Sequence, residues 1–190
     1  MCIRDRLITI TYEYSYASEK DKSFQEQSML SVIYVQTSTE FAANNIQTFN
    51  NASKALDMAL KDKTWTAALE QKDNFVSKDP AIIVDVDETV LDNSSFQSRT
   101  ILSGLSYPNG WAKWVNESMA TAVEGVYEFL HYANENDVKI FYVTNRLESF
   151  REPTIRNLKS LGLPFDDNLN KVFPQNFSCT TKYHSVICQQ

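Results

Sequence analysis

Apolar residues recur at helical spacing through the first third of the chain. From Ser28 onward, side chains three or four residues apart fall on one face, namely those of Leu30, Ile33, Tyr34, Thr37 and Phe41. Similar spacing continues from Ile46 to Leu60, and neither Pro nor Gly interrupts residues 28–71. The pattern predicts one long helix or two consecutive helices, with a short further turn at Trp65 and Leu69. Packing in the core accounts for such an apolar stripe.

Two short apolar runs further along the chain are typical of buried strands. Residues 81–84 read Ala-Ile-Ile-Val and are followed by Asp85 and Asp87, and residues 139–143 are followed by Thr144, Asn145 and Arg146. Apolar, β-branched runs of this length suit strands that are buried on both faces of a parallel sheet. Asp79-Pro80 ends the preceding helical region.

Helical patterns alternate with the two strands. Apolar residues between 123 and 133 predict one helix, and Pro153 starts another that Gly162 closes as its C′ residue. Tyr107-Pro108-Asn109-Gly110 predicts a turn. The order of strand, helix, strand and helix predicts an α/β fold with parallel strands and a right-handed crossover. Because ligands of such sheets bind beyond the carboxyl ends of the strands, the polar residues after both strands are expected to converge.

Composition narrows the class of function. The chain has 190 residues, 43% of them hydrophobic, which suits one globular domain or a domain with a small cap. The net charge of -6 argues against a broad surface for nucleic acid polymers. The three cysteines form no CxxC pair, so a zinc site is not expected. Cys179 and Cys188 could pair or could be unrelated thiols.

Asp85 and Asp87 are the strongest candidates for chemistry. Alternate residues of an extended segment point to the same side, so both carboxylates can face one centre. One carboxylate could attack phosphorus while the other serves as general acid and base. Mg²⁺ would offset the charge of two carboxylates and a phosphate, and the Thr144 hydroxyl could bind phosphate oxygens. The alternative is an acidic loop that follows a strand and caps the next helix.

A longer string extends this motif and is far more specific. Residues 81–93, Ala-Ile-Ile-Val-Asp-Val-Asp-Glu-Thr-Val-Leu-Asp-Asn, resemble the first motif of the haloacid-dehalogenase phosphatases in the form typical of class C bacterial acid phosphatases, the outer-membrane lipoprotein 5′-nucleotidase type. Residues 141–146, Phe-Tyr-Val-Thr-Asn-Arg, are similar to the second motif of that family. Further similar stretches are 36–41, 55–69, 111–115 and 154–164, so the resemblance covers roughly Ser28 to Phe165.

The resemblance implies roles for individual residues. Asp85 would be the nucleophile and a Mg²⁺ ligand, and Asp87 the general acid and base, bound to Mg²⁺ through its backbone carbonyl. Substrate binding would fall to Thr144, Asn145, Arg146, Phe96 and Trp111, with Thr144 on the phosphate and Asn145 and Arg146 in supporting roles. Phe96, Trp111 or Trp114 could stack on a nucleobase, and for each of them plain packing stays open. Asp92 and Asn93 would order the loop after the nucleophile.

The resemblance also divides the chain. It implies a disordered or unreliable N-terminus over residues 1–27, an acid phosphatase domain over 28–170 and an atypical tail over 171–190. Within the domain, 28–78 would be a helical cap region, 79–95 and 120–165 a Rossmann-like core with a parallel sheet and flanking helices, and 96–119 a cap-side segment. The later Lys and the Gly-Asp turn of the family do not occur, although Lys182 is a weak candidate for the Lys. We therefore expect an incomplete C-terminal core with an unpaired sheet edge, and weak Mg²⁺ binding and turnover.

The expected function is hydrolysis of phosphate monoesters, 5′-nucleotides among them, by a Mg²⁺-dependent acid phosphatase that forms an aspartyl-phosphate. The partner would be a small phosphomonoester and no nucleic acid polymer. The family also implies a periplasmic or outer-membrane-associated protein, attached to the membrane through an N-terminal lipid. An inactive fragment, or a non-enzymatic storage-type relative of the same superfamily, is the alternative.

Overall fold

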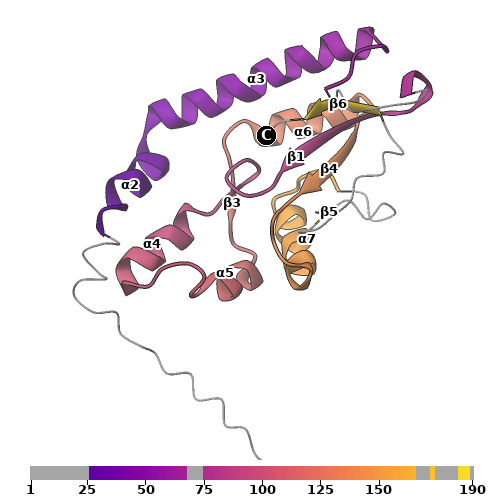
Figure 1. Cartoon of the computed structure of the whole chain (residues 1–190). Coiled ribbons are helices and arrows are strands. Elements are labelled where there is room, and N and C mark those ends of the chain that lie inside the picture. The colour runs from indigo at the N-terminus through magenta and orange to yellow at the C-terminus, as the bar shows by residue number, and fades with distance from the viewer. Residues whose placement is uncertain (1–25, 68–74, 166–171, 174–183, 189–190) are drawn as a thin grey trace, which may run out of the picture.

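The computed structural model describes residues 26–67, 75–165, 172–173 and 184–188. Its helices are α2 (Met29–Thr37), α3 (Thr39–Lys61), α4 (Ser94–Ser103), α5 (Trp111–Glu117), α6 (Val126–Glu135) and α7 (Arg151–Ser160), with 3-10 turns η1 (Phe75–Ser77) and η2 (Glu148–Phe150). Figure 1 shows α2 and α4 together at one end of the molecule, with the long α3 leading back towards the sheet. No helix among these residues is both long enough and apolar enough to cross a membrane.

A parallel sheet forms the centre of the fold. Its strands are β1 (Pro80–Asp85), β4 (Lys139–Val143), β5 (Val172–Phe173) and β6 (His184–Cys188), in the order β5-β4-β1-β6. All three pairings are parallel, and in the central one Asp85 lies opposite Val143. β2 (Leu91–Asp92) and β3 (Thr121–Ala122) form a separate antiparallel pair. The predicted α/β class with a parallel sheet and flanking helices is confirmed.

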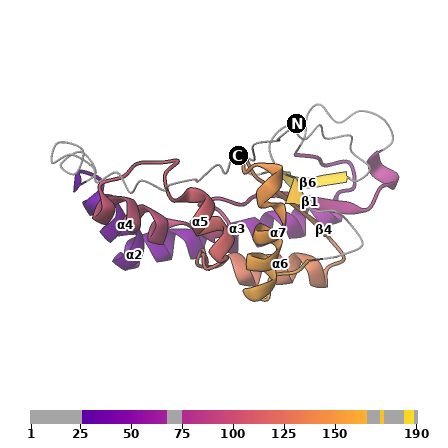
Figure 2. The ribbon, with the colours of Figure 1, turned by 90° about the horizontal axis from the view of Figure 1, so that it is seen from below.

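The helical end and the sheet end of the molecule are distinct. Figure 2, turned by 90° from the first view, again shows α2 and α4 towards one end and the strands β1, β4 and β6 towards the other. The helix α3 runs alongside both parts, since it contacts α2 near its start and α6 further along. This helix therefore links α2 to the core.

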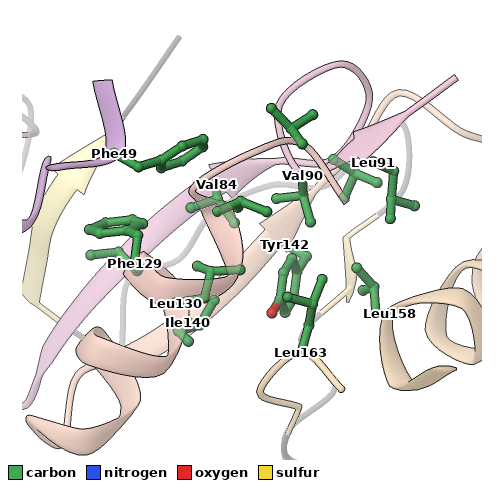
Figure 3. Packing of buried hydrophobic residues seen from close by; sticks show 14 of the residues in the cluster. Phe49, Val84, Val90, Leu91, Phe129, Leu130, Ile140, Tyr142, Leu158 and Leu163 are labelled. Carbon is green, nitrogen blue, oxygen red and sulfur yellow. The ribbon is translucent and has the colours of Figure 1, made fainter. Parts of the chain in front are cut away.

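The core lies between the sheet and the helices that follow its strands. Ile140 and Tyr142 of β4 are buried and alternate with partly exposed neighbours, so both side chains point to one face. Figure 3 shows Leu130 of α6 and Leu158 of α7 among these buried side chains. Phe49 of α3 joins the same cluster and lies 5.7 Å from Phe129 of α6, measured between ring centroids. The N-terminal helical region is therefore anchored to the core through α3.

The N-terminal helical pattern resolves into two helices. The chain is extended at Ser38 (φ -77°, ψ 119°), between α2 and α3. The Ser38 side chain accepts a hydrogen bond from the backbone N–H of Phe41 at 3.2 Å, as an N-cap does. Trp65 lies in the expected turn after α3, where its N–H reaches the Asp62 carbonyl at 3.0 Å, and Leu69 lies outside the described residues.

Both later helices are present, but α6 begins at Val126 and not at Val123, and α7 begins at Arg151, before Pro153. Gly162 has a φ of 69° and follows the C-cap of α7, as expected of a C′ glycine. The turn at 107–110 is present, with the Trp111 N–H bonded to the Pro108 carbonyl at 3.1 Å. The helices α4 and α5 and the pair β2–β3 are additional elements within a region whose sequence is mixed and turn-rich. These elements are short, so they carry too few apolar positions to reveal a period.

The C-terminal strands correct one expectation. The sequence predicts that the atypical tail leaves the sheet edge beside β1 and β4 unpaired, but β5 pairs with β4 and β6 pairs with β1. Both segments are short and contain β-branched residues, Val172 in one and Val186 and Ile187 in the other, which favour strands. Cys179 and Lys182 lie outside the described residues, so the expectations for them are untested.

Candidate active site

The parallel register of β1 and β4 brings the two predicted motifs together. Asp85 is paired with Val143, and the backbone N–H of Val86 donates to the Val143 carbonyl at 3.0 Å. The residues that follow these strands therefore leave the sheet at the same edge. Asp85 and Asp87 come from one strand end, and Thr144 and Arg146 come from the other.

Asp87 is the centre of the polar contacts at this edge. Its Oδ2 accepts a hydrogen bond from the Thr144 hydroxyl at 2.9 Å. Its Oδ1 accepts from the Asn93 amide at 3.0 Å and from the Arg146 Nη2 at 2.7 Å. The Arg146 Nε adds a bond of 3.0 Å to Oδ1. Such charge-assisted, two-pronged contacts fix the orientation of a carboxylate closely.

Arg146 is turned towards the protein. Arg146 is only 5% exposed, and its Nη1 donates a hydrogen bond to the Thr154 hydroxyl at 3.0 Å. The guanidinium carbon lies 5.3 Å from the centroid of the Trp111 ring. Most of its donors are thus used by Asp87, Thr154 and Asn93, and its charge balances that of Asp87. Asn145, between Thr144 and Arg146, is exposed.

Asp85 has fewer and weaker contacts than Asp87. Its Oδ2 accepts a long hydrogen bond of 3.3 Å from the Thr89 hydroxyl. Burial is the main cause that raises the pKa of Asp85, a backbone hydrogen bond from Val86 opposes the rise, and the negative charge of Asp87 adds to it. The Asp85 carboxylate is therefore partly desolvated and lightly bonded, which leaves it available to a cation or an electrophile.

The loop after β1 folds back on itself. Leu91 N donates to the Val86 carbonyl at 2.8 Å, and Glu88 N donates to the Leu91 carbonyl at 2.9 Å. Glu88 has a φ of 59°, an uncommon conformation for a residue other than glycine. Neither of these two bonds uses the backbone carbonyl of Asp87. Asp92 accepts from Ser94 N at 2.7 Å at the start of α4, so the loop is ordered as expected of Asp92 and Asn93.

Aromatic residues of the cap-side segment flank this edge. Phe96 of α4 and Trp111 of α5 meet edge to face, with ring centroids 5.1 Å apart. Tyr107, which the sequence did not single out, lies 6.0 Å from Trp111 and is 68% exposed. Trp114 is 3% exposed and has no free face for a ligand. Its indole N–H donates to Asn93 at 2.8 Å, so Trp114 packs in the core and does not stack on a substrate.

The oxygen atoms at this edge suit a partial coordination shell for Mg²⁺. The Asp85 carboxylate and the Asp87 backbone carbonyl, which accepts neither of the two loop hydrogen bonds, are hard oxygen donors of the kind that Mg²⁺ prefers. Mg²⁺ commonly keeps several waters and binds substrate phosphate, so one carboxylate and one carbonyl form a fitting subset. In the part of the chain that the structure describes, no group of three or more His, Cys, Asp or Glu residues could hold a metal.

Comparison with known proteins identifies the family. Residues 11–186 match the model of the family described as HAD superfamily, subfamily IIIB (acid phosphatase). The chain is also similar to the solved structure of the class C acid phosphatase from Bacillus anthracis, with 33% identity and a TM-score of 0.69. A tungstate-bound structure of that protein matches with 32% identity and a TM-score of 0.68.

The matches also show how far along the chain the similarity to this family extends. Each structural match covers 80% of this chain and 59% of the solved chain, so this chain spans less than two thirds of the length of those relatives. The family match reaches residue 186 and thus extends beyond Phe165, where the resemblance in the sequence motifs ends. On these matches, the chain belongs to the acid phosphatase family of the HAD superfamily, subfamily IIIB.

Proposed function

We propose that the protein is a Mg²⁺-dependent acid phosphatase that hydrolyses phosphate monoesters through an aspartyl-phosphate on Asp85. The observation that carries the proposal is the contrast between the two carboxylates at one sheet edge. Asp85 is lightly bonded, whereas Asp87 is held by Thr144, Asn93 and Arg146. A nucleophile must approach the substrate freely, and a general acid must be held in one orientation.

In the proposed first step, an oxygen of Asp85 attacks phosphorus. The P–O bond to the leaving group breaks as the new P–O bond to Asp85 forms, and protonated Asp87 gives its proton to the departing oxygen. In the second step, water attacks the same phosphorus and Asp87 accepts a proton from it. The bond between Asp85 and phosphorus then breaks, which releases phosphate and restores both carboxyl groups to their starting states.

Thr144 is proposed to bind the phosphate once substrate is present. Its hydroxyl accepts a hydrogen bond from Arg146 N at 3.1 Å and donates to Asp87 at 2.9 Å. A hydroxyl has a single proton, so it must turn away from Asp87 to donate to a phosphate oxygen. Asn145 is exposed beside it and is proposed to assist, while Arg146 supports the site by neutralising Asp87.

Mg²⁺ would be held by the Asp85 carboxylate and the Asp87 carbonyl. When bound, it would supply positive charge that offsets the repulsion between the carboxylates and the phosphate. The acid phosphatases of this superfamily are generally metal-dependent, which supports the assignment of a metal but does not specify Mg²⁺. The relative from Bacillus anthracis with tungstate bound supports a site for a tetrahedral oxyanion like phosphate.

The aromatic residues beside Arg146 support substrates with flat leaving groups. Phe96 is only 7% exposed and packs edge to face against Trp111, which also meets the exposed Tyr107 edge to face. Trp111 and Tyr107 are therefore the rings that a ligand could reach. Aromatic side chains can stack on a nucleobase or a phenyl ring. We therefore propose 5′-nucleotides and aryl phosphates as the substrate classes to test.

The test measures phosphate release from p-nitrophenyl phosphate and from a nucleoside monophosphate at about pH 5–6, the acidic range in which a carboxylic acid can still donate a proton. Release that requires Mg²⁺, stops with chelator and is lost in Asp85→Asn supports the mechanism. Asp137→Asn is a matched control, because Asp137 is exposed and its φ of 58° is one that Asn tolerates.

Absence of release has two explanations, which a second, longer protein separates. Activity that returns with a C-terminal extension like that of the relatives means that the family site needs groups beyond those present here. Inactivity of both proteins favours the storage-type alternative and contradicts the proposed function.

A further inference from the structure

A hydrogen-bonded chain runs from the cap-side helix α5 to the carboxylate of Asp87. The indole N–H of Trp114 donates to Asn93 Oδ1 at 2.8 Å, and Asn93 Nδ2 donates to Asp87 Oδ1 at 3.0 Å. Trp114 is 3% exposed and Asn93 is 2% exposed, so water does not compete at either residue. Trp114 and Asp87, the two ends of this series of hydrogen bonds, lie 27 residues apart in sequence and on different elements of the fold.

The donors around Asn93 fix the orientation of its amide. An indole N–H and a guanidinium can only donate hydrogen bonds, so the amide oxygen must face Trp114 and Arg146. The amide NH₂ is then obliged to face Asp87. The contact from Arg146 Nη2 is 3.4 Å long, whereas that from Trp114 is 2.8 Å, so Trp114 contributes the stronger restraint.

The same helix reaches Asp87 by a second route. Trp111 lies one turn before Trp114 on α5, and its ring lies beneath the guanidinium of Arg146 and against Phe96. Arg146 in turn holds Asp87. The helix α5 therefore contacts two of the groups that hydrogen-bond to Asp87, namely Arg146 through Trp111 and Asn93 through Trp114.

We propose that Trp114 is a positioning residue, which acts through Asn93 to hold Asp87 in the orientation for proton transfer to the leaving group. The inference rests on the proposed function and adds a residue of the cap-side segment to the machinery of that reaction. Without the indole N–H, the Asn93 amide can turn its oxygen towards Asp87, and two acceptors would then face each other.

The basicity of the leaving group gives a specific test. p-Nitrophenolate is a stable anion that departs with little help from an acid, whereas phenolate depends on protonation. The two aryl phosphates carry similar rings, so both use the same aromatic surface. We expect Trp114→Phe to lower kcat/KM for phenyl phosphate by about tenfold and for p-nitrophenyl phosphate by about twofold or less. The ratio of the two values is independent of the fraction of active protein.

Controls distinguish a positioning role from a structural one. Trp65→Phe, in the turn after α3 and 40% exposed, should leave the ratio unchanged. In an Asn93→Ala background, Trp114→Phe should have no further effect on the ratio, because the intermediate group is gone. Trp114→His is the second variant if Trp114→Phe does not fold, since imidazole can place a ring N–H two bonds from Cγ as indole does, and it should restore the wild-type ratio.

Equal losses on both substrates, or none, would overturn the proposal while leaving the phosphatase assignment intact. If neither this protein nor the C-terminally extended protein hydrolyses either ester under any metal condition, the proposed function itself is contradicted. The two failures are thus distinguishable from the same set of assays.

Discussion

Arg146 and Asp87 form a two-pronged ion pair across the ends of β4 and β1, with Nη2 and Nε of the guanidinium at 2.7 and 3.0 Å from Oδ1 of the carboxylate. The side chain of Arg146 is 3% exposed and that of Asp87 is 24% exposed. The pair joins the two segments that the site is built from. Its geometry also explains why Asp87 and not Asp85 is the restrained carboxylate.

Arg146→Lys is expected to destabilise the protein although it keeps the charge. An ammonium cannot reproduce the planar fork of a guanidinium. Thr154 and Asn93 therefore each lose a hydrogen-bond donor, and Asp87 loses one of its two contacts with residue 146. We expect the free energy of unfolding in urea to fall by about 3 kcal/mol, with a loss of phosphatase activity. Arg151→Lys, which alters an exposed pair with Glu148, should change it by about 0.5 kcal/mol or less. Similar small losses in both variants would contradict this account of Arg146.

Asn157 of α7 holds the chain just after the cap-side segment. Its Oδ1 accepts from Ala120 N at 3.1 Å and its Nδ2 donates to the Ala120 carbonyl at 2.8 Å, with both residues buried. Asn157→Ala leaves two buried backbone groups unpaired. We therefore expect the free energy of unfolding, measured in urea, to fall by about 2–4 kcal/mol. Asn116→Ala removes an exposed side-chain bond to Ala112 and should have a small effect.

The sequence indicated the central strands and their terminal residues well. Residues 139–143 form β4 as predicted, and Asp85 ends β1, because continuous β-branched runs between turns have few alternatives to a buried strand. Parallel pairing then brings Asp87 near Thr144 and Arg146 without further information. These features depend on local pattern and on one general rule of sheet topology.

Other features of the site could not be predicted from the sequence in the same way. The bond from Trp114 to Asn93 joins residues of different elements, and no local periodicity reports which face of α5 turns inward over seven residues. The motif predicts Arg146 on the substrate side, but its ion pair and its burial depend on the tertiary fold. Strands β5 and β6 escape prediction because they are short runs within an otherwise polar tail.

Two glycines with similar backbone conformations should differ in their tolerance of alanine. Gly125 and Gly162 have φ values of 85° and 69°, so both substitutions carry left-handed strain of about 1 kcal/mol. A Cβ on Gly125 would meet the Ile46 Cα at 3.0 Å and the Phe49 Cβ at 3.3 Å, whereas one on Gly162 would meet Tyr127 at an ordinary 3.7 Å. The Ile46 backbone cannot move without shifting α3.

We therefore expect Gly125→Ala to lower the free energy of unfolding by about 2–4 kcal/mol and Gly162→Ala by about 1 kcal/mol. Denaturant titration of the two variants beside the wild type measures the difference. Equal values would mean that α3 can move away from α6, and the anchoring of the helical region through Phe49 would need revision.

Tyr142 should make stability depend on alkaline pH. Its side chain is fully buried in the core shown in Figure 3, and its hydroxyl donates to the Pro164 carbonyl at 2.8 Å. Burial raises the pKa of Tyr142 far above its usual value of 10.0. Because the unfolded chain loses this proton first, the contribution of Tyr142 to stability is fully present below about pH 10 and is lost as the pH rises beyond it.

Tyr142→Phe removes both the hydrogen bond and the titrating group. Near pH 7 the variant should be less stable by about 1 kcal/mol, because the bond to Pro164 is missing. Above pH 10 the wild type loses about 1.4 kcal/mol per pH unit relative to the variant, so the two unfolding free energies should meet near pH 11. Tyr107→Phe changes an exposed ring, so its free energy of unfolding should depend on pH as that of the wild type does. A difference between Tyr142→Phe and wild type that stays constant from pH 7 to 11 would show that the Tyr142 hydroxyl titrates normally and is reached by water.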